Sequence, residues 1–98
     1  MEEVLIRRRA GINLEVTYST TRKKWVVRHF GGDRVWAVER TRTRAESTAA
    51  VLAWFIAVNF NRPKRGRRVG TCEVHVRELD GTFGDPSTYG TDPTASKG

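Results

Sequence analysis

The sequence predicts an α+β domain in which an antiparallel sheet of three to five strands carries one α-helix on one face. Short segments between residues 12 and 41 alternate apolar and polar side chains and are separated by turn-forming residues. A longer apolar stretch follows at 44–60, and alternation returns at 69–79. A period of two is typical of half-buried strands, whereas an apolar stretch of this length favours a helix. The expected order of elements is therefore β-β-β-α-β.

The three strands before the helix are expected to form an antiparallel meander. Residues 12–19 alternate throughout, and the side chains expected on one face are Ile12, Leu14, Val16 and Tyr18. Residues 24–30 and 35–41 form the second and third strands, and Gly31-Gly32-Asp33 makes the turn between them. The connections are too short for a parallel crossover, which needs a dozen residues or more.

The helix is expected to run from about residue 44 to residue 60. Thr43 and Glu46 fit a capping box, and Asn61 and Pro63 should end the helix. The large apolar side chains, with Phe55 as a core anchor, should pack on the sheet. The opposite arc is made of small residues: Ala49, Ala53 and Ala57. This arc is either plain alanine surface or a helix–helix contact, in a homodimer or with a partner protein.

A basic loop, a last strand and a tail complete the chain. Five basic residues crowd the loop: Arg62, Lys64, Arg65, Arg67 and Arg68. The strand at 69–79 should bury Cys72, Val74 and Val76. Fifteen of the 19 residues from 80 to 98 are Gly, Pro, Ser, Thr or Asp, a composition that predicts a disordered tail. The expected division is a single domain at 1–79 and a tail at 80–98.

Composition excludes several classes of protein. The longest apolar run has ten residues, far fewer than the roughly 20 of a membrane-spanning helix. One cysteine cannot form an internal disulfide, and no signal peptide is visible, so a cytoplasmic protein is expected. Two histidines and one cysteine, without CxxC or HExxH spacing, predict no metal site. No phosphate-binding glycine loop and no acid–base pair is visible, so we expect neither a cofactor nor enzymatic activity.

The basic residues point to a polyanionic partner. The chain carries 18 Lys and Arg against 11 Asp and Glu, a net charge of +7. The basic side chains expected on or beside the strands are Lys24, Arg28, Arg34, Arg40 and Arg42. If Trp25 and Val27 face the helix, the aromatic Phe30 lies with Lys24 and Arg28 on the open face of the sheet. Basic side chains interleaved with an aromatic on an open sheet can read a DNA groove or hold unpaired bases. Basic residues on strands also keep sheet edges soluble, which is the alternative interpretation.

The region from residue 12 to residue 58 resembles a known class of DNA-binding domain. The features that carry the resemblance are Trp25-Val26-Val27-Arg28, the Gly31-Gly32 turn, and Thr43-Arg44-Ala45-Glu46 leading to Ala50 and Trp54. They look like the small three-strand-plus-helix domains of phage tyrosine integrases, which bind arm-type sites, and of plant AP2-type proteins. The resemblance implies that the exposed sheet face enters the major groove of DNA. It assigns the contacts to Arg28, Arg34 and Arg40, and it suits a small phage or mobile-element accessory protein.

Two functions follow from the sequence. The first is a non-enzymatic nucleic-acid-binding module that prefers duplex DNA, binding bases through the sheet and phosphates through the arginine-rich loop. The second is an interaction protein that docks on an acidic host or partner protein through the basic face or the alanine-lined helix.

Overall fold

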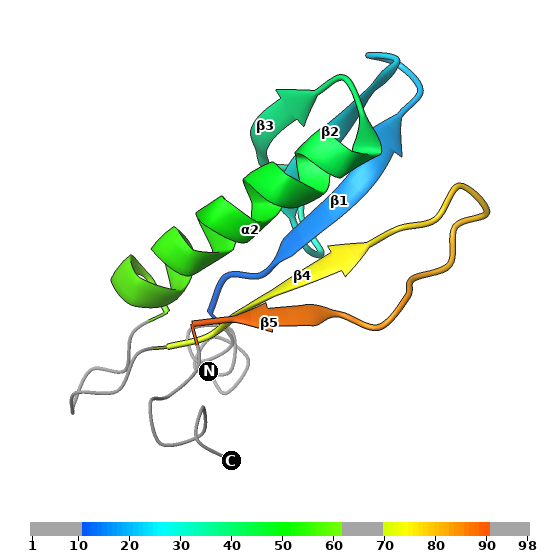
Figure 1. The fold of residues 1–98 in the computed structure, drawn as a ribbon. Helices are drawn as coiled ribbons and strands as arrows, with labels where there is room; N and C mark the ends of the chain where they lie inside the picture. Colours follow the sequence, from blue (N-terminus) through cyan, green and yellow to red (C-terminus); the bar gives the residue numbers. More distant parts are fainter. Residues whose placement is uncertain (1–10, 62–69, 91–98) are drawn as a thin grey trace, which may run out of the picture.

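The computed structural model describes residues 11–61 and 70–90, which form one sheet with a helix across one of its faces (Figure 1). The elements in chain order are β1 (Leu14–Ser19), β2 (Lys24–His29), β3 (Val35–Glu39), α2 (Arg42–Asn59), β4 (Cys72–Val76) and β5 (Ser87–Tyr89). The α+β class and the β-β-β-α-β order are therefore confirmed, with one further strand after β4.

The sheet is mixed, and the expectation of a purely antiparallel sheet was wrong. Its strand order is β3-β2-β1-β4-β5, and β1 pairs with β4 in parallel, with Leu14 opposite Val74 and Val16 opposite Val76. All other pairs are antiparallel. Strands β1 and β3 run in the same direction, and α2 runs back in the opposite direction. The chain therefore leaves α2 at the end of the sheet where β1 starts. The next strand must then run parallel to β1.

The chain from residue 80 to residue 90 belongs to the fold, which corrects the expected disordered tail and the domain boundary at 79. Strand β5 pairs with β4, and Phe83 forms a bridge with Arg77. Gly90 is buried with φ +75°, and a Cβ at this position would overlap the Cβ of Ala57 and lie 2.8 Å from the carbonyl oxygen of Gly70. Residues 91–98, the rest of that expected tail, lie outside the described residues.

Helix α2 turns its small side chains, not its large ones, toward the sheet. Ala45, Ala49, Ala53 and Ala57 are fully buried together with Ile56. By contrast, Phe55 is 50% exposed, so its assignment as a core anchor was wrong. Small side chains allow the helix backbone to approach the sheet closely. Apart from Ile56, the large core residues come from the sheet: Leu14, Val16 and Val27. The proposed interface at Ala49, Ala53 and Ala57 was wrong too, because packing within the domain already covers these residues.

Side-chain hydrogen bonds fix both ends of α2. The N-cap is Thr41 rather than Thr43, since the Thr41 hydroxyl accepts from the Arg44 N–H at 3.2 Å, while Glu46 binds Arg42. Beyond the other end, Asn61 accepts from the Ile12 N–H at 2.8 Å. Its amide also donates to the carbonyl oxygens of Ile12 and Thr71, both at 2.7 Å. Asn61 thereby ties the end of α2 to the starts of β1 and β4.

Candidate functional site

The face of the sheet opposite α2 is called the open face here. Leu14, Val16 and Val27 belong to the core under the helix. Because successive side chains of a strand point to opposite sides, Glu15 and Thr17 of β1 and Val26 and Arg28 of β2 project onto the open face. Glu15, Thr17 and Val26 are nonetheless buried, at 3–7% exposure. Their burial means that surrounding side chains close over the middle of the open face.

A buried carboxylate organises two arginines at the centre of the open face. Oε2 of Glu15 accepts from Nη2 of Arg28 at 3.3 Å and from Nε of Arg77 at 3.0 Å. Strand register produces this arrangement, because Glu15 lies opposite Arg28, and the backbone N–H of Arg77 donates to Val16 beside it. A buried charge must be paired, and Glu15 is paired with both cations. A second carboxylate, that of Glu73, lies beside them and binds Nε2 of His75 at 3.0 Å.

Both arginine side chains remain partly exposed, although Nε of Arg28 is buried. The side chains of Arg28 and Arg77 are 33% and 40% exposed. A guanidinium has five N–H donors, so the bond to Glu15 occupies only a minority of them. Arg28 and Arg77 are thus held in place by Glu15 while still offering donors to an anionic ligand.

Three aromatic rings lie beside this pair. The Phe30 ring stacks on His75 with a centroid distance of 4.0 Å and an interplanar angle of 14°. Phe83 meets both rings edge-on, at 5.5 and 6.2 Å. The guanidinium carbon of Arg77 lies 4.7 Å from the centroid of Phe83. Phe30 and Phe83 are each about two-fifths exposed. We call the group of Glu15, Arg28, Phe30, His75, Arg77 and Phe83 the aromatic–arginine cluster.

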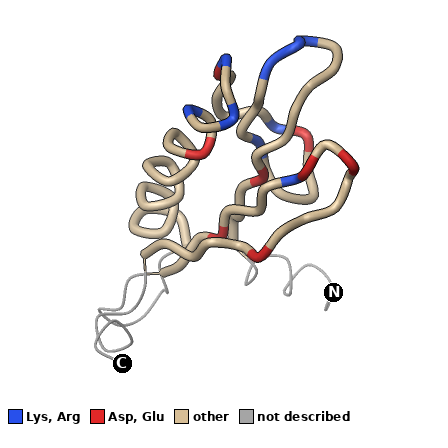
Figure 2. The backbone as a smooth tube through the Cα atoms, turned by 45° about the vertical axis from the view of Figure 1, so that its right-hand side comes forward, with Lys and Arg blue, Asp and Glu red and all other residues tan. Residues whose placement is uncertain are grey.

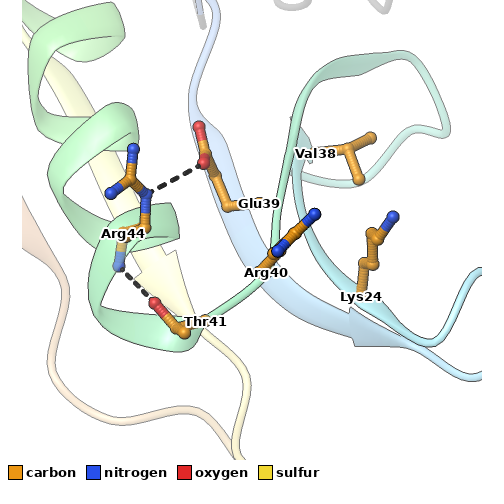
Figure 3. A pocket seen from close by; sticks show the side chains of 6 residues that line it. All are labelled: Lys24, Val38, Glu39, Arg40, Thr41 and Arg44. Carbon is orange, nitrogen blue, oxygen red and sulfur yellow. Dashed lines mark hydrogen bonds and ion pairs between the residues drawn. The ribbon is translucent and has the colours of Figure 1, made fainter.

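A second basic group lies at the end of the open face near the start of α2. A shallow groove of about 680 Å³ is lined by Lys24, Val38, Glu39, Arg40, Thr41 and Arg44. Lys24, Val38 and Arg40 lie on one side of this groove, whereas Arg44 pairs with Glu39 at 3.6 Å on the side of α2 (Figure 3). A neighbouring groove of about 250 Å³ runs from the β1–β2 turn past Arg22 to Arg28. The smaller groove thus leads from the β1–β2 turn to Arg28 of the cluster.

The structure divides the predicted binding residues between the two sides of the sheet. Lys24, Arg28 and Arg40 lie on the open face. Arg34 instead packs over Trp36, with 5.4 Å between its guanidinium carbon and the ring centroid, on the side covered by α2. Arg42 lies over Trp25 on that same side. The predicted loop residues lie outside the described part of the chain: Arg62, Lys64, Arg65, Arg67 and Arg68.

Arg42 is held by two carboxylates. Its Nε donates to Glu46 at 2.8 Å, and its two terminal nitrogens donate to Glu78 at 2.8 and 2.9 Å. These hydrogen bonds raise the pKa of Arg42 above its ordinary value, and the bond to Arg42 lowers the pKa of Glu78. Arg42 therefore fastens the start of α2 to the segment after β4, and we remove it from the candidate binding residues.

Sequence reasoning missed four members of the cluster. Alternation does place Glu15, His75 and Arg77 on the outward side of their strands. The signal that was absent is the pairing of β4 with β1, which brings Arg77 to Glu15. Phe83 was missed because the composition around it predicted a disordered tail.

In the described residues, basic and acidic side chains gather in different parts of the molecule. Residues 11–61 contain eight basic and four acidic side chains, and residues 70–90 contain one basic and four acidic side chains. Figure 2 shows the basic positions at the β1–β2 turn and around the start of α2, with acidic positions along β4 and the connection to β5. A polyanion would therefore be attracted to the end of the domain that carries Lys24 and Arg40.

The comparisons with known proteins add no further constraint. The chain matches no model of a protein family, no curated protein and no solved structure. Within residues 11–61 and 70–90, no three His, Cys, Asp or Glu side chains are grouped so that they could hold a metal ion. Of the described helical residues, none form a helix that is long and apolar enough to cross a membrane.

Proposed function

We propose that this chain is a non-enzymatic nucleic-acid-binding module that binds through its open sheet face. The observation that carries the proposal is the aromatic–arginine cluster, in which Arg28 and Arg77 are positioned by Glu15 beside the exposed rings of Phe30 and Phe83. Guanidinium groups bind phosphates and base edges through paired hydrogen bonds. Exposed aromatic rings stack on unpaired bases.

The width of the sheet favours a single strand as the ligand of the cluster. Five strands spaced about 4.8 Å apart span about 19 Å, and the major groove of B-DNA is only about 12 Å wide. The cluster lies across β2, β1 and β4, in the middle of this width. A single strand can lie across the middle of a sheet, whereas a duplex would reach only one edge.

Duplex DNA, the ligand expected from the sequence, remains the competing arrangement. In it the β1–β2–β3 part of the sheet would approach the major groove with Lys24 and Arg40, as the resemblance to three-strand DNA-binding domains implies. The cluster would then contribute little. The two arrangements thus predict different effects of removing Phe83.

Electrostatic attraction supports either arrangement. Five of the seven residues from 62 to 68 are basic, and this segment directly follows Asn61 at the end of the described helix region. Such a segment neutralises phosphates without regard to base sequence. We therefore assign general affinity to residues 62–68 and any base preference to the open face.

Fluorescence anisotropy with labelled single-stranded DNA, single-stranded RNA and duplex DNA of matched sequence tests the proposal. Phe83→Ala and Arg77→Gln should each weaken single-strand binding about 5- to 100-fold, since stacking of one base contributes roughly 1–3 kcal/mol. Arg34→Gln is the matched control, because it removes the same charge from the side of the sheet covered by α2. It should change affinity about twofold or less.

The outcomes separate the alternatives. Tighter duplex binding that Phe83→Ala leaves unchanged would favour the edge arrangement at Lys24 and Arg40. Equal effects of Arg77→Gln and Arg34→Gln would mean that the cluster contributes to binding only through its positive charge. No binding to any of the three nucleic acids at low salt would contradict the proposal and favour docking of the basic face on an acidic protein.

A further inference from the structure

The outer face of α2 is a second surface, which the elements at 11–61 and 70–90 leave exposed. Val51, Trp54, Phe55 and Val58 are 41–70% exposed, and we call them the α2 stripe. Their spacing of i, i+3, i+4 and i+7 places them on one arc of about 100°, opposite the alanine face that meets the sheet. This spacing is typical of a helix face that packs on another helix.

Aromatic residues beside the stripe enlarge this surface. Phe60 is 55% exposed and meets Phe55 edge-on at 5.7 Å and Trp36 at 6.5 Å. Three half-exposed aromatics and two valines amount to roughly 400–500 Å² of apolar surface. A patch of that size is as large as the largest apolar patch on a typical monomeric protein, and such patches are often functional. Two such patches buried together approach the roughly 1,000 Å² of a specific interface.

We propose that the α2 stripe is a homodimer interface, in which α2 packs antiparallel against α2 of a second copy. Residues 47–61 contain no charged side chain, so the stripe offers nothing that would select an acidic or a basic partner. An apolar, uncharged stripe complements a copy of itself. A two-fold axis across the stripe closes the assembly at two chains.

The helix dipole favours the antiparallel orientation of the pair. Each helix start carries a partial positive charge, and each helix end carries a partial negative charge. With the axis near residues 54 and 55, each helix start lies about 19 Å from the axis, so the two starts are about 40 Å apart and each lies beside the end of the partner helix. A parallel pair would bring the two positive starts together.

The proposed dimer leaves the open sheet face free, because the stripe and the open face lie on opposite sides of the domain. Dimerisation therefore does not depend on nucleic-acid binding, and it is measured without nucleic acid. Failure of either proposal leaves the other intact.

Sedimentation velocity of the full chain over a concentration series measures the proposed assembly. The native chain should sediment as a dimer, and Phe55→Glu or Trp54→Glu should raise the dimer dissociation constant at least 50-fold, because central aromatic residues dominate such interfaces. Thr43→Glu is the control, since it adds the same charge at an exposed site more than two turns away. Circular dichroism should show that all three variants stay folded. A native chain that remains monomeric, or a Phe55→Glu variant that remains dimeric, overturns the proposal.

Cross-linking tests the antiparallel orientation separately. With the axis near residues 54 and 55, Val51 of one copy lies opposite Val58 of the other. A mixture of Val51→Cys and Val58→Cys chains should form a disulfide-linked dimer under mild oxidation, and neither variant should do so alone. The native Cys72 is fully buried and does not compete. Cross-linking of Val51→Cys with itself would overturn the antiparallel arrangement.

Discussion

Two buried side chains, Glu15 and Cys72, show how position alters the chemistry of a residue in this small domain. Glu15 lies in a site that is 3% exposed, where Arg28 and Arg77 both bind its carboxylate. Cys72 is fully buried at the start of β4, where burial raises the pKa of its thiol to about 11, with Glu73 adding to the effect. The carboxylate is therefore available to organise a binding surface, and the thiol is chemically inert at neutral pH.

The raised pKa of Cys72 predicts a loss of stability in alkaline solution. Below pH 9 the thiol is protonated in both the folded and the unfolded chain, so it has no pH-dependent effect. Between pH 9 and about 11 the unfolded chain loses the proton and the folded chain keeps it. The free energy of unfolding should therefore fall by on the order of 2 kcal/mol by pH 11.

Urea denaturation of the native chain and of Cys72→Ala from pH 8 to pH 11 isolates this contribution, because all other titrating groups are shared. The difference in stability between the two proteins should shrink as the pH rises. A difference that stays constant over this range would show that the thiol does not titrate between the two states.

At the scale of elements, α2 and β5 occupy places that their composition does not suggest. The helix is apolar on both sides, and it buries the side with the smaller residues. Strand β5 is only three residues long, yet Gly90 directly after it packs against Ala57 of the helix. The close approach of the helix to the sheet therefore depends on small residues from both elements.

Enlarging the alanine face should destabilise the domain. Ala53→Leu places three further carbon atoms where Ala53 has no exposed surface, and overpacking of this kind costs roughly 1–3 kcal/mol. Thr43→Leu is the control on the same helix, because Thr43 is exposed and lies outside the α2 stripe. It should change stability by about 0.5 kcal/mol or less. Chemical denaturation measures both; similar effects of the two substitutions would contradict the observed orientation of α2.

Two glycines lie in the region that was expected to be disordered. Comparing their substitutions distinguishes the cost of backbone strain from the cost of steric overlap. Gly81 and Gly90 both have positive φ, but only Gly90 has neighbours that an added Cβ would meet. Gly81→Ala should therefore cost only the strain of roughly 1–2 kcal/mol. Gly90→Ala should cost roughly 1–3 kcal/mol more, because the helix and Gly70 would have to move. Thermal denaturation compares the two, and equal costs would mean that β5 does not pack on α2 in solution.

At the scale of the whole molecule, the net positive charge is distributed unevenly along the chain. The described residues contain nine basic and eight acidic side chains, so most of the net charge of +7 belongs to the remaining segments. Residues 62–68 contribute five of those positive charges. The folded sheet supplies positioned contacts, and these segments supply most of the long-range attraction for a polyanion.

The salt dependence of nucleic-acid binding should reveal the role of residues 62–68. Replacing their five basic side chains with Ser or Gln should lower the slope of log K against log salt by about 3.5 for a single strand and about 4.5 for a duplex, if each side chain meets one phosphate. Anisotropy titrations at three or more salt concentrations give the slope. An unchanged slope would place this segment outside the binding surface.

The sequence alone determined the α+β class, the strand–helix order and three basic members of the open face. Alternation in residues 12–19 predicted that Leu14 and Val16 reach the core, whereas Tyr18, expected on the same face, is 37% exposed. The same rule places Lys24 and Arg28 on the other face of the sheet. These predictions succeed because the period of a strand is a local property, fixed by backbone geometry within a few residues.

Tertiary structure decided the buried side of α2, the parallel pairing of β1 with β4, and the site itself. A helix that is apolar all round has no polar side to mark its exposed face. The alanine side is the buried one because small side chains let the helix backbone pack close to the sheet. The pairing of β4 with β1 joins residues some 60 positions apart, and this pairing brings Arg77 to Glu15. Strand β5 is only three residues long, between Pro86 and Gly90, and exists because β4 offers it an edge. Such features depend on which elements meet in space, and no local pattern in the sequence encodes that.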